Sequence, residues 1–120
     1  MTTTEQSCIG FCIGTGPASE KTAIALRLIE ASLNAGLSAR VFLYDDGIYN
    51  GLDGVSVKNS LSTFVQLAQR GVPIYTCENM AKHRGVIRTN CHSGIEIVSL
   101  LAYSELIVES RWVLQFRTTA

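Results

Sequence analysis

The sequence predicts a single three-layer α/β/α domain with a mostly parallel sheet of about five strands, like flavodoxin or Rossmann folds. Short, nearly continuous apolar runs, typical of strands buried on both faces of a parallel sheet, alternate with segments that carry apolar residues at helical spacing. Turn residues separate the two kinds of segment. A chain of 120 residues suggests one domain, over residues 1–120, whose core is stable without disulfides or metals.

The first half of the chain is expected to form a strand, a helix and a second strand. Residues 8–14 are a continuous apolar run, which suits a buried strand. A turn follows, and Ser19 is the expected N-cap of a helix that stops before Gly36. A second apolar strand over 39–43 leads into a loop over 44–51 that is rich in turn residues.

The second half repeats the alternation with shorter elements. Asn59 or Ser60 is expected to cap a helix that ends at Gly71, and a third strand then leads to Cys77. The remaining expectations are a short helix over 78–83, an irregular segment over 86–93, a short strand or helix start over 95–98, a helix over 100–107, a closing strand over 112–116, and loose ends at 1–6 and 117–120.

Composition excludes several classes of function. The formal net charge is zero, so the basic surface of a nucleic-acid-binding protein is not expected. The chain has no apolar run of about 18 residues, which argues against a membrane span, and its first residues lack the basic start of a signal peptide. We therefore expect a cytoplasmic protein whose four cysteines are thiols. Because only 17% of residues are charged, apolar surface patches and oligomeric contacts are expected.

Cys77 is the main candidate for chemistry. It ends an apolar run and precedes a helix-forming run, which places its thiol at the carboxyl end of a strand and the amino end of a helix. Helix amino ends have unpaired N–H groups and a partial positive charge, and both favour the reactive thiolate. The loops at 15–19 and 44–51 should converge on the same edge of the sheet. A buried structural cysteine is the competing interpretation.

The other cysteines and nearby cations have weaker cases. Cys8 and Cys12, four residues apart on a strand, should share one face of the sheet and serve packing. Cys91 is either a second thiol that exchanges sulfur with Cys77 or an incidental thiol. His83 and Arg84, and Lys82 before them, would support a thiolate if the helix turned them toward the sulfur.

Metal and nucleotide sites are not expected, and no cofactor is predicted. The chain has no C-x-x-C pair, which argues against zinc. Glu20 stands where a phosphate-binding loop needs glycine, and Ser19 replaces the last glycine of a dinucleotide-binding pattern. Asp45 and Asp46 are better explained by a turn than by a paired-carboxylate site.

The chain carries three motifs in order: a strand and loop over 41–50, Cys77 followed by Ala81 and Arg84-Gly85-Val86, and a closing strand over 112–116. Together they resemble the DsrE/TusD family of sulfur-relay (DsrEFH-like) proteins. The resemblance implies that the residue matching Cys77 carries sulfur as a persulfide. It also implies an upstream donor protein, a downstream acceptor, and trimers or hexamers of one chain or of related chains, in tRNA thiolation or sulfur oxidation.

We therefore expect a sulfurtransferase or sulfur carrier in which Tyr49, Asn50 and Arg84 shape the pocket of Cys77. The alternatives are a noncatalytic assembly subunit of a DsrEFH/TusBCD-like complex and a thiol redox protein that uses Cys77, with Cys91 as its partner. The chain departs from the family pattern in a shorter segment over 89–94 and in an unmatched Cys91-His92 pair. These departures concern the pathway and the partner more than Cys77.

Overall fold

The computed structural model describes residues 8–52 and 58–118. The expected loose end at 1–6, and residues 119–120 of the one expected at 117–120, lie outside the described residues. Strands and helices alternate along the chain. In order, the elements are β1 (Cys8–Ile13), α2 (Glu20–Asn34), β2 (Ser38–Leu43), the 3₁₀ helix η1 (Asp45–Gly51), α3 (Lys58–Gln69), β3 (Ile74–Cys77), α4 (Glu78–His83), the 3₁₀ helix η2 (Arg88–Asn90), β4 (Ile95–Val98), α5 (Leu100–Val108) and β5 (Trp112–Phe116).

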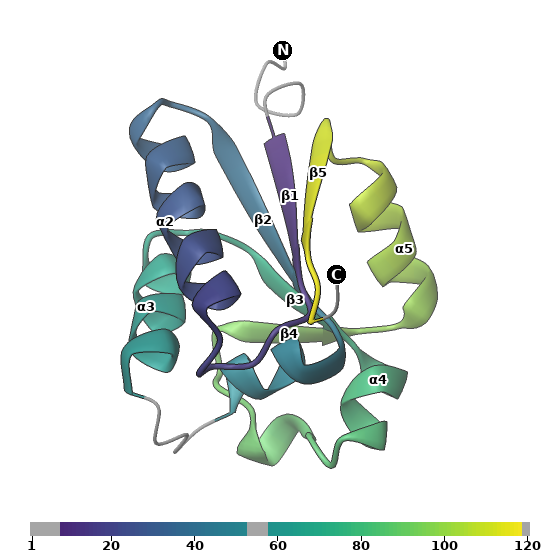
Figure 1. Cartoon of the computed structure of the whole chain (residues 1–120). Helices are drawn as coiled ribbons and strands as arrows, with labels where there is room; N and C mark the ends of the chain where they lie inside the picture. The colour runs from purple at the N-terminus through teal and green to yellow at the C-terminus, as the bar shows by residue number, and fades with distance from the viewer. Residues whose placement is uncertain (1–7, 53–57, 119–120) are drawn as a thin grey trace.

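The five strands form one parallel sheet in the order β4-β3-β2-β1-β5. The chain steps in one direction from β1 to β4 and then returns through α5 to the opposite edge. Because crossover connections between parallel strands are right-handed, a reversal of direction moves the connecting helix to the other face. Figure 1 shows this result, with α2 and α3 on one side of the sheet and α5 on the other. The predicted α/β class with helices on both faces is confirmed.

Alternation along the strands divides the core into two clusters. On the face covered by α2 and α3, called here the α2–α3 face, residues such as Phe11, Val41 and Ile74 form the larger cluster. The strand residues between them point to the opposite face, which α5 covers and which is called here the α5 face. The smaller cluster there consists of Cys12, Phe42, Cys77 and Tyr103, all buried.

Local sequence signals explain most element boundaries. The Ser19 side chain accepts a hydrogen bond from the Lys21 N–H at 3.1 Å, as expected of an N-cap. Gly71, with φ of +92°, follows α3 in a left-handed conformation that suits glycine. The expected cap of that helix was wrong, because α3 begins at Lys58 and Asn59 and Ser60 lie inside it.

The loop after β2 is more ordered than its turn residues indicate. It forms the 3₁₀ helix η1, which packs closely against the end of β1. A Cβ atom on Gly47 would collide with the backbone oxygen of Ile13, so only glycine fits at this position without a shift of backbone. The ambiguous segment 95–98 is a strand, and it forms the edge of the sheet beside β3.

Candidate functional site

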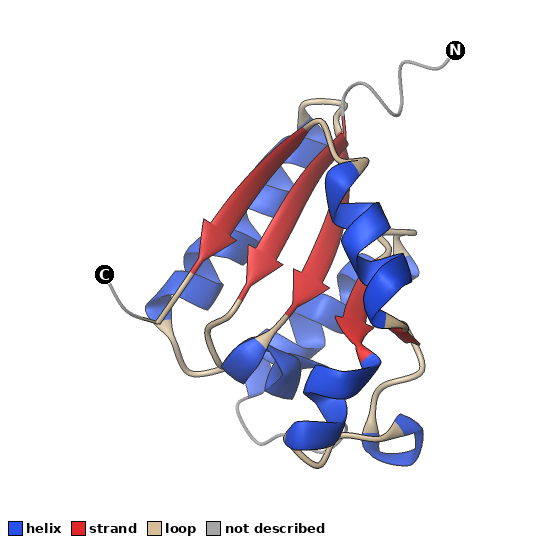
Figure 2. Ribbon diagram, turned by 90° about the vertical axis from the view of Figure 1, so that its right-hand side faces the viewer, coloured by secondary structure: helices blue, strands red, loops and turns tan. Residues whose placement is uncertain are grey.

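The candidate site lies beyond the carboxyl ends of the strands, where Figure 2 shows the arrowheads pointing toward the short helices. The connection that follows β3 packs on the α2–α3 face, where Val86 and Cys91 join the larger cluster. The connection that follows the neighbouring strand β4 is α5, on the opposite face. Ligand sites of open α/β sheets form where adjacent strands send their connections to opposite faces. Cys77 pairs with Val98 at this point.

Cys77 occupies the predicted strand-to-helix position. It is the last residue of β3 and the N-cap residue of α4, with extended backbone angles (φ −76°, ψ 132°). Its side chain points to the α5 face and is only 1% exposed. Cys77 thus stands at the amino end of α4, but its side chain accepts no hydrogen bond from the first N–H groups of the helix, and the sulfur is closed off from solvent in this conformation.

Asn50 ties two of the three predicted loops together. It is fully buried, and its side-chain amide donates hydrogen bonds to the backbone oxygens of Thr15 at 3.0 Å and Gly47 at 2.9 Å. The Thr15 hydroxyl in turn lies 2.6 Å from the hydroxyl of Thr22 on α2. Asn50 therefore fixes the loop after β1 against η1, and the predicted convergence of these two loops is confirmed.

Arg84 joins the third loop to the second. Its Nη1 donates to Asp46 Oδ1 at 2.9 Å, and its Nη2 lies 3.7 Å from Asp45 Oδ1. The guanidinium also lies 5.7 Å from the centre of the Tyr49 ring, within cation–π range. The positive charge of Arg84 is thus directed at two carboxylates of η1. The sequence interpretation of the two aspartates as a plain turn missed this role, although the acidic pair and the arginine stand in loops predicted to converge.

His83 is not brought against the sulfur. The ring is exposed, and its Nδ1 lies 3.1 Å from the backbone oxygen of Asn79 in the same helix. Lys82 is exposed as well. The structure thus brings Tyr49, Asn50 and Arg84 together around the loops near Cys77 and leaves His83 outside this group.

A family model for DsrE/DsrF-like proteins matches residues 8–116. The chain belongs to the DsrE/DsrF-like family. This is a family generally related to sulfur relay, and its members work in sulfur-relay complexes.

Individual proteins agree with this assignment. The chain is similar to the ychN protein from E. coli, with 26% identity, a TM-score of 0.77 and coverage of 92% of this chain and 99% of that one. A protein of unknown function from Methanobacterium thermoautotrophicum, MTH1491, shares the fold at 18% identity and a TM-score of 0.67, over 90% of this chain and 97% of that one. An uncharacterized protein from Methanopyrus kandleri, MK0008, is 27% identical over 100 residues, which are 81% of this chain and 83% of that protein.

Cys91 of this DsrE/DsrF-like chain does not approach Cys77. It is buried in the cluster on the α2–α3 face, and its sulfur lies 3.7 Å from where a Cβ on Gly51 would stand. Cys77 belongs to the cluster on the α5 face. The two side chains lie in clusters on opposite faces of the sheet, so this conformation does not bring together the pair that direct exchange of sulfur would need.

Cys12 is the cysteine that shares the cluster of Cys77. The sequence interpretation assigned it to packing, and its burial agrees with that role. In the register of the sheet, Cys12 is paired with Phe42 of β2, and Phe42 is paired with Tyr75 of β3. Cys77 is therefore two strands and two residues away, a Cα separation of about 11–12 Å. A disulfide requires a separation below about 7 Å, so these two residues cannot bond without movement of the backbone.

Burial keeps the groups around Cys77 neutral near neutral pH. It raises the pKa of Cys12 from its ordinary value of 9.0 to about 11. The pKa of Tyr103 is also raised, first by burial and then by the nearby Cys12 and Cys77. Tyr103, which comes from α5, is the residue at the site that the sequence did not reveal, because no local pattern relates position 103 to position 77.

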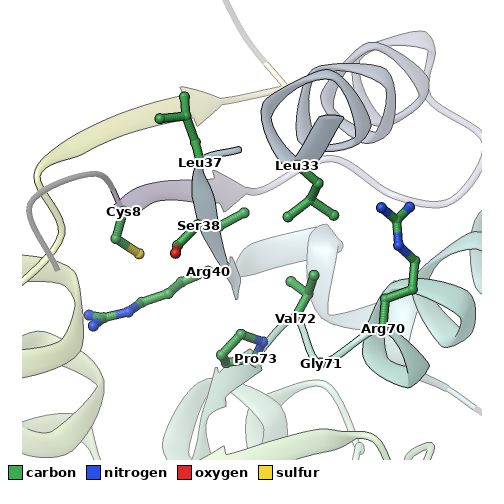
Figure 3. A pocket seen from close by; sticks show the side chains of 10 residues that line it. Cys8, Leu33, Leu37, Ser38, Arg40, Arg70, Gly71, Val72 and Pro73 are labelled. Carbon is green, nitrogen blue, oxygen red and sulfur yellow. The ribbon is translucent and has the colours of Figure 1, made fainter. Parts of the chain in front are cut away.

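A separate hollow of about 360 Å³ lies at the opposite end of the sheet, at the amino ends of the strands (Figure 3). Two arginines from β2 and the end of α3 line it. Arg40 donates to the backbone oxygen of Leu106 at 3.1 Å, and Arg70 pairs with Glu30 at 2.8 Å. Both cations thus have partners within the chain, and the hollow is remote from Cys77.

Within residues 8–52 and 58–118, no three His, Cys, Asp or Glu side chains gather closely enough to hold a metal ion. Within the same ranges, no helix has both the length and the apolar character needed to cross a membrane.

Proposed function

We propose that this DsrE/DsrF-like chain is a sulfur carrier that holds sulfane sulfur as a persulfide on Cys77. The observation that carries the proposal is the place of Cys77, between β3 and α4 at the point where adjacent connections leave to opposite faces. Membership of the family and the motif that continues through Ala81 and Arg84-Gly85-Val86 support it.

The proposed transfer is two thiol exchanges without net oxidation. The Cys77 thiolate attacks the outer sulfur of a donor persulfide, R–S–SH. The bond between the two donor sulfurs breaks, Cys77–S–SH forms, and the donor leaves as the thiolate R–S⁻. An acceptor thiolate then attacks the outer sulfur on Cys77, takes it as a persulfide and returns Cys77 to the thiolate form.

Backbone groups rather than a basic side chain would stabilise the thiolate. Cys77 precedes the first turn of α4, whose N–H groups have no partner within the helix. Arg84 faces Asp45 and Asp46, and His83 faces its own helix. In this proposal Tyr49, Asn50 and Arg84 hold the loops around the sulfur, and the docked donor or acceptor determines specificity.

Sulfur loading tests the proposal directly. Incubation with a low-molecular-weight persulfide donor is expected to add about 32 Da, one sulfur atom, to the peptide that contains Cys77. Cys77→Ser should abolish this addition, whereas Cys91→Ser, a matched change of a cysteine on the other face of the sheet, should retain it. Equal loading of the Cys77→Ser variant would contradict the proposal, and absence of loading in the wild type would favour a noncatalytic assembly subunit.

We further propose that the chain assembles with copies of itself or with related chains through an apolar surface near its carboxyl end. The surface consists of Leu100, Leu101 and Val108 on α5 and Trp112, Val113 and Leu114 on β5, each at least 41% exposed. Trp112 and Leu114 point to the α2–α3 face and Val113 to the opposite face, so the exposed apolar side chains occupy both faces of the edge strand β5 as well as α5. Large exposed apolar areas usually mark a contact with another chain. By contrast, the edge at β4 has an exposed Glu96, and Arg88 donates to the oxygen of Ile95 at 3.0 Å. Such polar protection is typical of edges that stay unpaired.

Light scattering after size-exclusion chromatography tests this assembly. The wild type is expected to elute as an oligomer, and Leu101→Asp should shift it toward the monomer, because a charge would be buried in the contact. Ile87→Asp is the matched control, since Ile87 is 52% exposed but lies near β4. A monomeric wild type, or equal effects of the two substitutions, would argue against this surface.

A further inference from the structure

The burial of Cys77 conflicts with any exchange between its sulfur and another molecule. A thiolate must be approached along the line of the bond that forms, and Cys77 is 1% exposed. Phe42 and Cys12, two residues of its cluster, belong to strands whose backbones are fixed by pairing on both sides. Tyr103 comes from α5, which lies on the sheet as a separate layer. The members of this cluster that strand pairing does not fix come from α5 and, through Met80, from the short helix α4, so movement of α5 would give access to Cys77.

Helix α5 is fastened to the sheet near both of its ends. In the part of the chain that the structure describes, two side-chain hydrogen bonds join them. Arg40 donates to Leu106 O at 3.1 Å toward the end of the helix, and the Tyr103 hydroxyl donates to Leu43 O at 3.2 Å toward its start. Leu43 is the last residue of β2 and stands level with Thr76, directly before Cys77. The bond from Tyr103 thus holds the end of α5 that covers the thiol.

The ring of Tyr103 contributes to the same closure. It is 5% exposed and packs edge-on against Phe42, with ring centres 5.7 Å apart. The adjoining residues at the start of the helix, Leu100 and Leu101, are 54% and 69% exposed. Figure 2 looks onto this face, with α5 in front of the sheet. The first turns of α5 therefore rest on the sheet largely through one side chain.

We propose that Tyr103 is a positioning residue that latches the start of α5 over Cys77, and that release of its hydrogen bond to Leu43 exposes the sulfur for exchange. In the proposed sulfur carrier, this latch would control when Cys77 can exchange sulfur, so its biological role rests on the proposed function. The latch itself concerns only the access of reagents to Cys77. Its test therefore needs no sulfur donor.

Alkylation of the folded protein with iodoacetamide, followed by mass spectrometry of each cysteine peptide, measures this access. When local opening limits the reaction, the rate reports the population of the open state. Tyr103→Phe keeps the ring and removes the hydroxyl, so Cys77 should react about threefold to tenfold faster, as expected for loss of one hydrogen bond. Tyr103→Ala should accelerate it by about a hundredfold or more, because the packing of the ring is lost as well.

Two controls separate a latch from general destabilisation. Tyr75→Phe makes the same chemical change in a half-buried tyrosine that stacks on Phe42 in the same layer, and it should leave the rate at Cys77 unchanged. Cys91 is the internal control, because its burial on the α2–α3 face does not depend on α5.

The outcomes are distinct. Faster alkylation of Cys77 in Tyr103→Phe with an unchanged rate at Cys91 supports the latch. An unchanged rate at Cys77, or an equal increase at Cys91, overturns it. If the latch is found but Cys77 takes up no sulfur, the proposed function fails alone. If Cys77 takes up sulfur in the wild type and its alkylation is unaffected by Tyr103→Phe, the latch fails alone.

Discussion

At the scale of single residues, Arg84 belongs to the motif that follows Cys77, and its contacts in the structure explain what an arginine does at this position. The arginine pairs with Asp46, approaches Asp45 and lies beside the ring of Tyr49. Asp45 has a φ of 47°, in the left-handed region that costs energy for residues other than glycine. The ion pairs help to hold this conformation. Arg84 therefore contacts the loop η1, and in the proposed function it would act on Cys77 only through that loop.

A pair of substitutions tests whether Arg84 acts through the loop. Arg84→Ala is expected to lower the free energy of unfolding by about 1 kcal/mol, since partly exposed ion pairs contribute little each, and to slow sulfur loading of Cys77. Asp46→Asn should have the same direction of effect in urea unfolding and in loading rate. If Arg84 instead acted directly on the sulfur, Asp46→Asn would release its charge toward the thiolate and speed loading.

At the scale of elements, the sequence predicted what depends on local pattern. The closing strand and the short helix after Cys77 have the expected bounds, because an apolar run in the one case and a strand-to-helix change in the other mark them. The start of α3 was misplaced, since Asn59 and Ser60 looked like caps yet lie in the helix. Asn and Ser hydrogen-bond locally wherever a helix begins, so two candidates near a boundary do not fix the first residue.

The surroundings of Cys77 could not be predicted in the same way. Its position between strand and helix follows from neighbouring residues, but its cover comes from Tyr103 on an element that crosses the whole sheet. The order of the strands in the sheet decides which helix lies on which face, and the local spacing of apolar residues does not reveal that order. For the same reason, the sequence left open whether Cys91 lies near Cys77, and the structure places it on the other face.

At the scale of the whole molecule, the buried acids of the α5 face set the response of stability to alkaline pH. Burial raises the pKa of Cys8, Cys12, Tyr44, Tyr75 and Tyr103. A raised pKa means that the folded chain keeps protons that the unfolded chain releases. Stability therefore falls as the pH rises from the pKa of each group in the unfolded chain to its higher pKa in the folded chain. The protein should therefore be more stable at neutral pH than above pH 9.

Cys12 provides the test of this pH dependence. The pKa of Cys12 is raised from its ordinary value of 9.0 to about 11 in the folded chain. At pH 10.5 this difference lowers the free energy of unfolding by about 2 kcal/mol. Urea unfolding at pH 7.5 and pH 10.5 under reducing conditions should show a smaller loss of stability for Cys12→Ala than for the wild type. The comparison concerns the difference between the two pH values, so the lower overall stability of the variant does not affect it. Identical losses in both proteins would show that Cys12 ionises equally in the folded and unfolded chains.

The nine-residue helix α5 has two sides with different proposed tasks. Its inner side covers a thiol, and its outer side carries some of the most exposed leucines of the described chain. A helix is only about 10 Å across. A substitution that adapts its outer side to a new neighbouring chain would therefore also change how its inner side packs on the sheet. Divergence among assembled relatives would then alter both which chains fit together and how readily each cysteine opens, and the two traits would be inherited together.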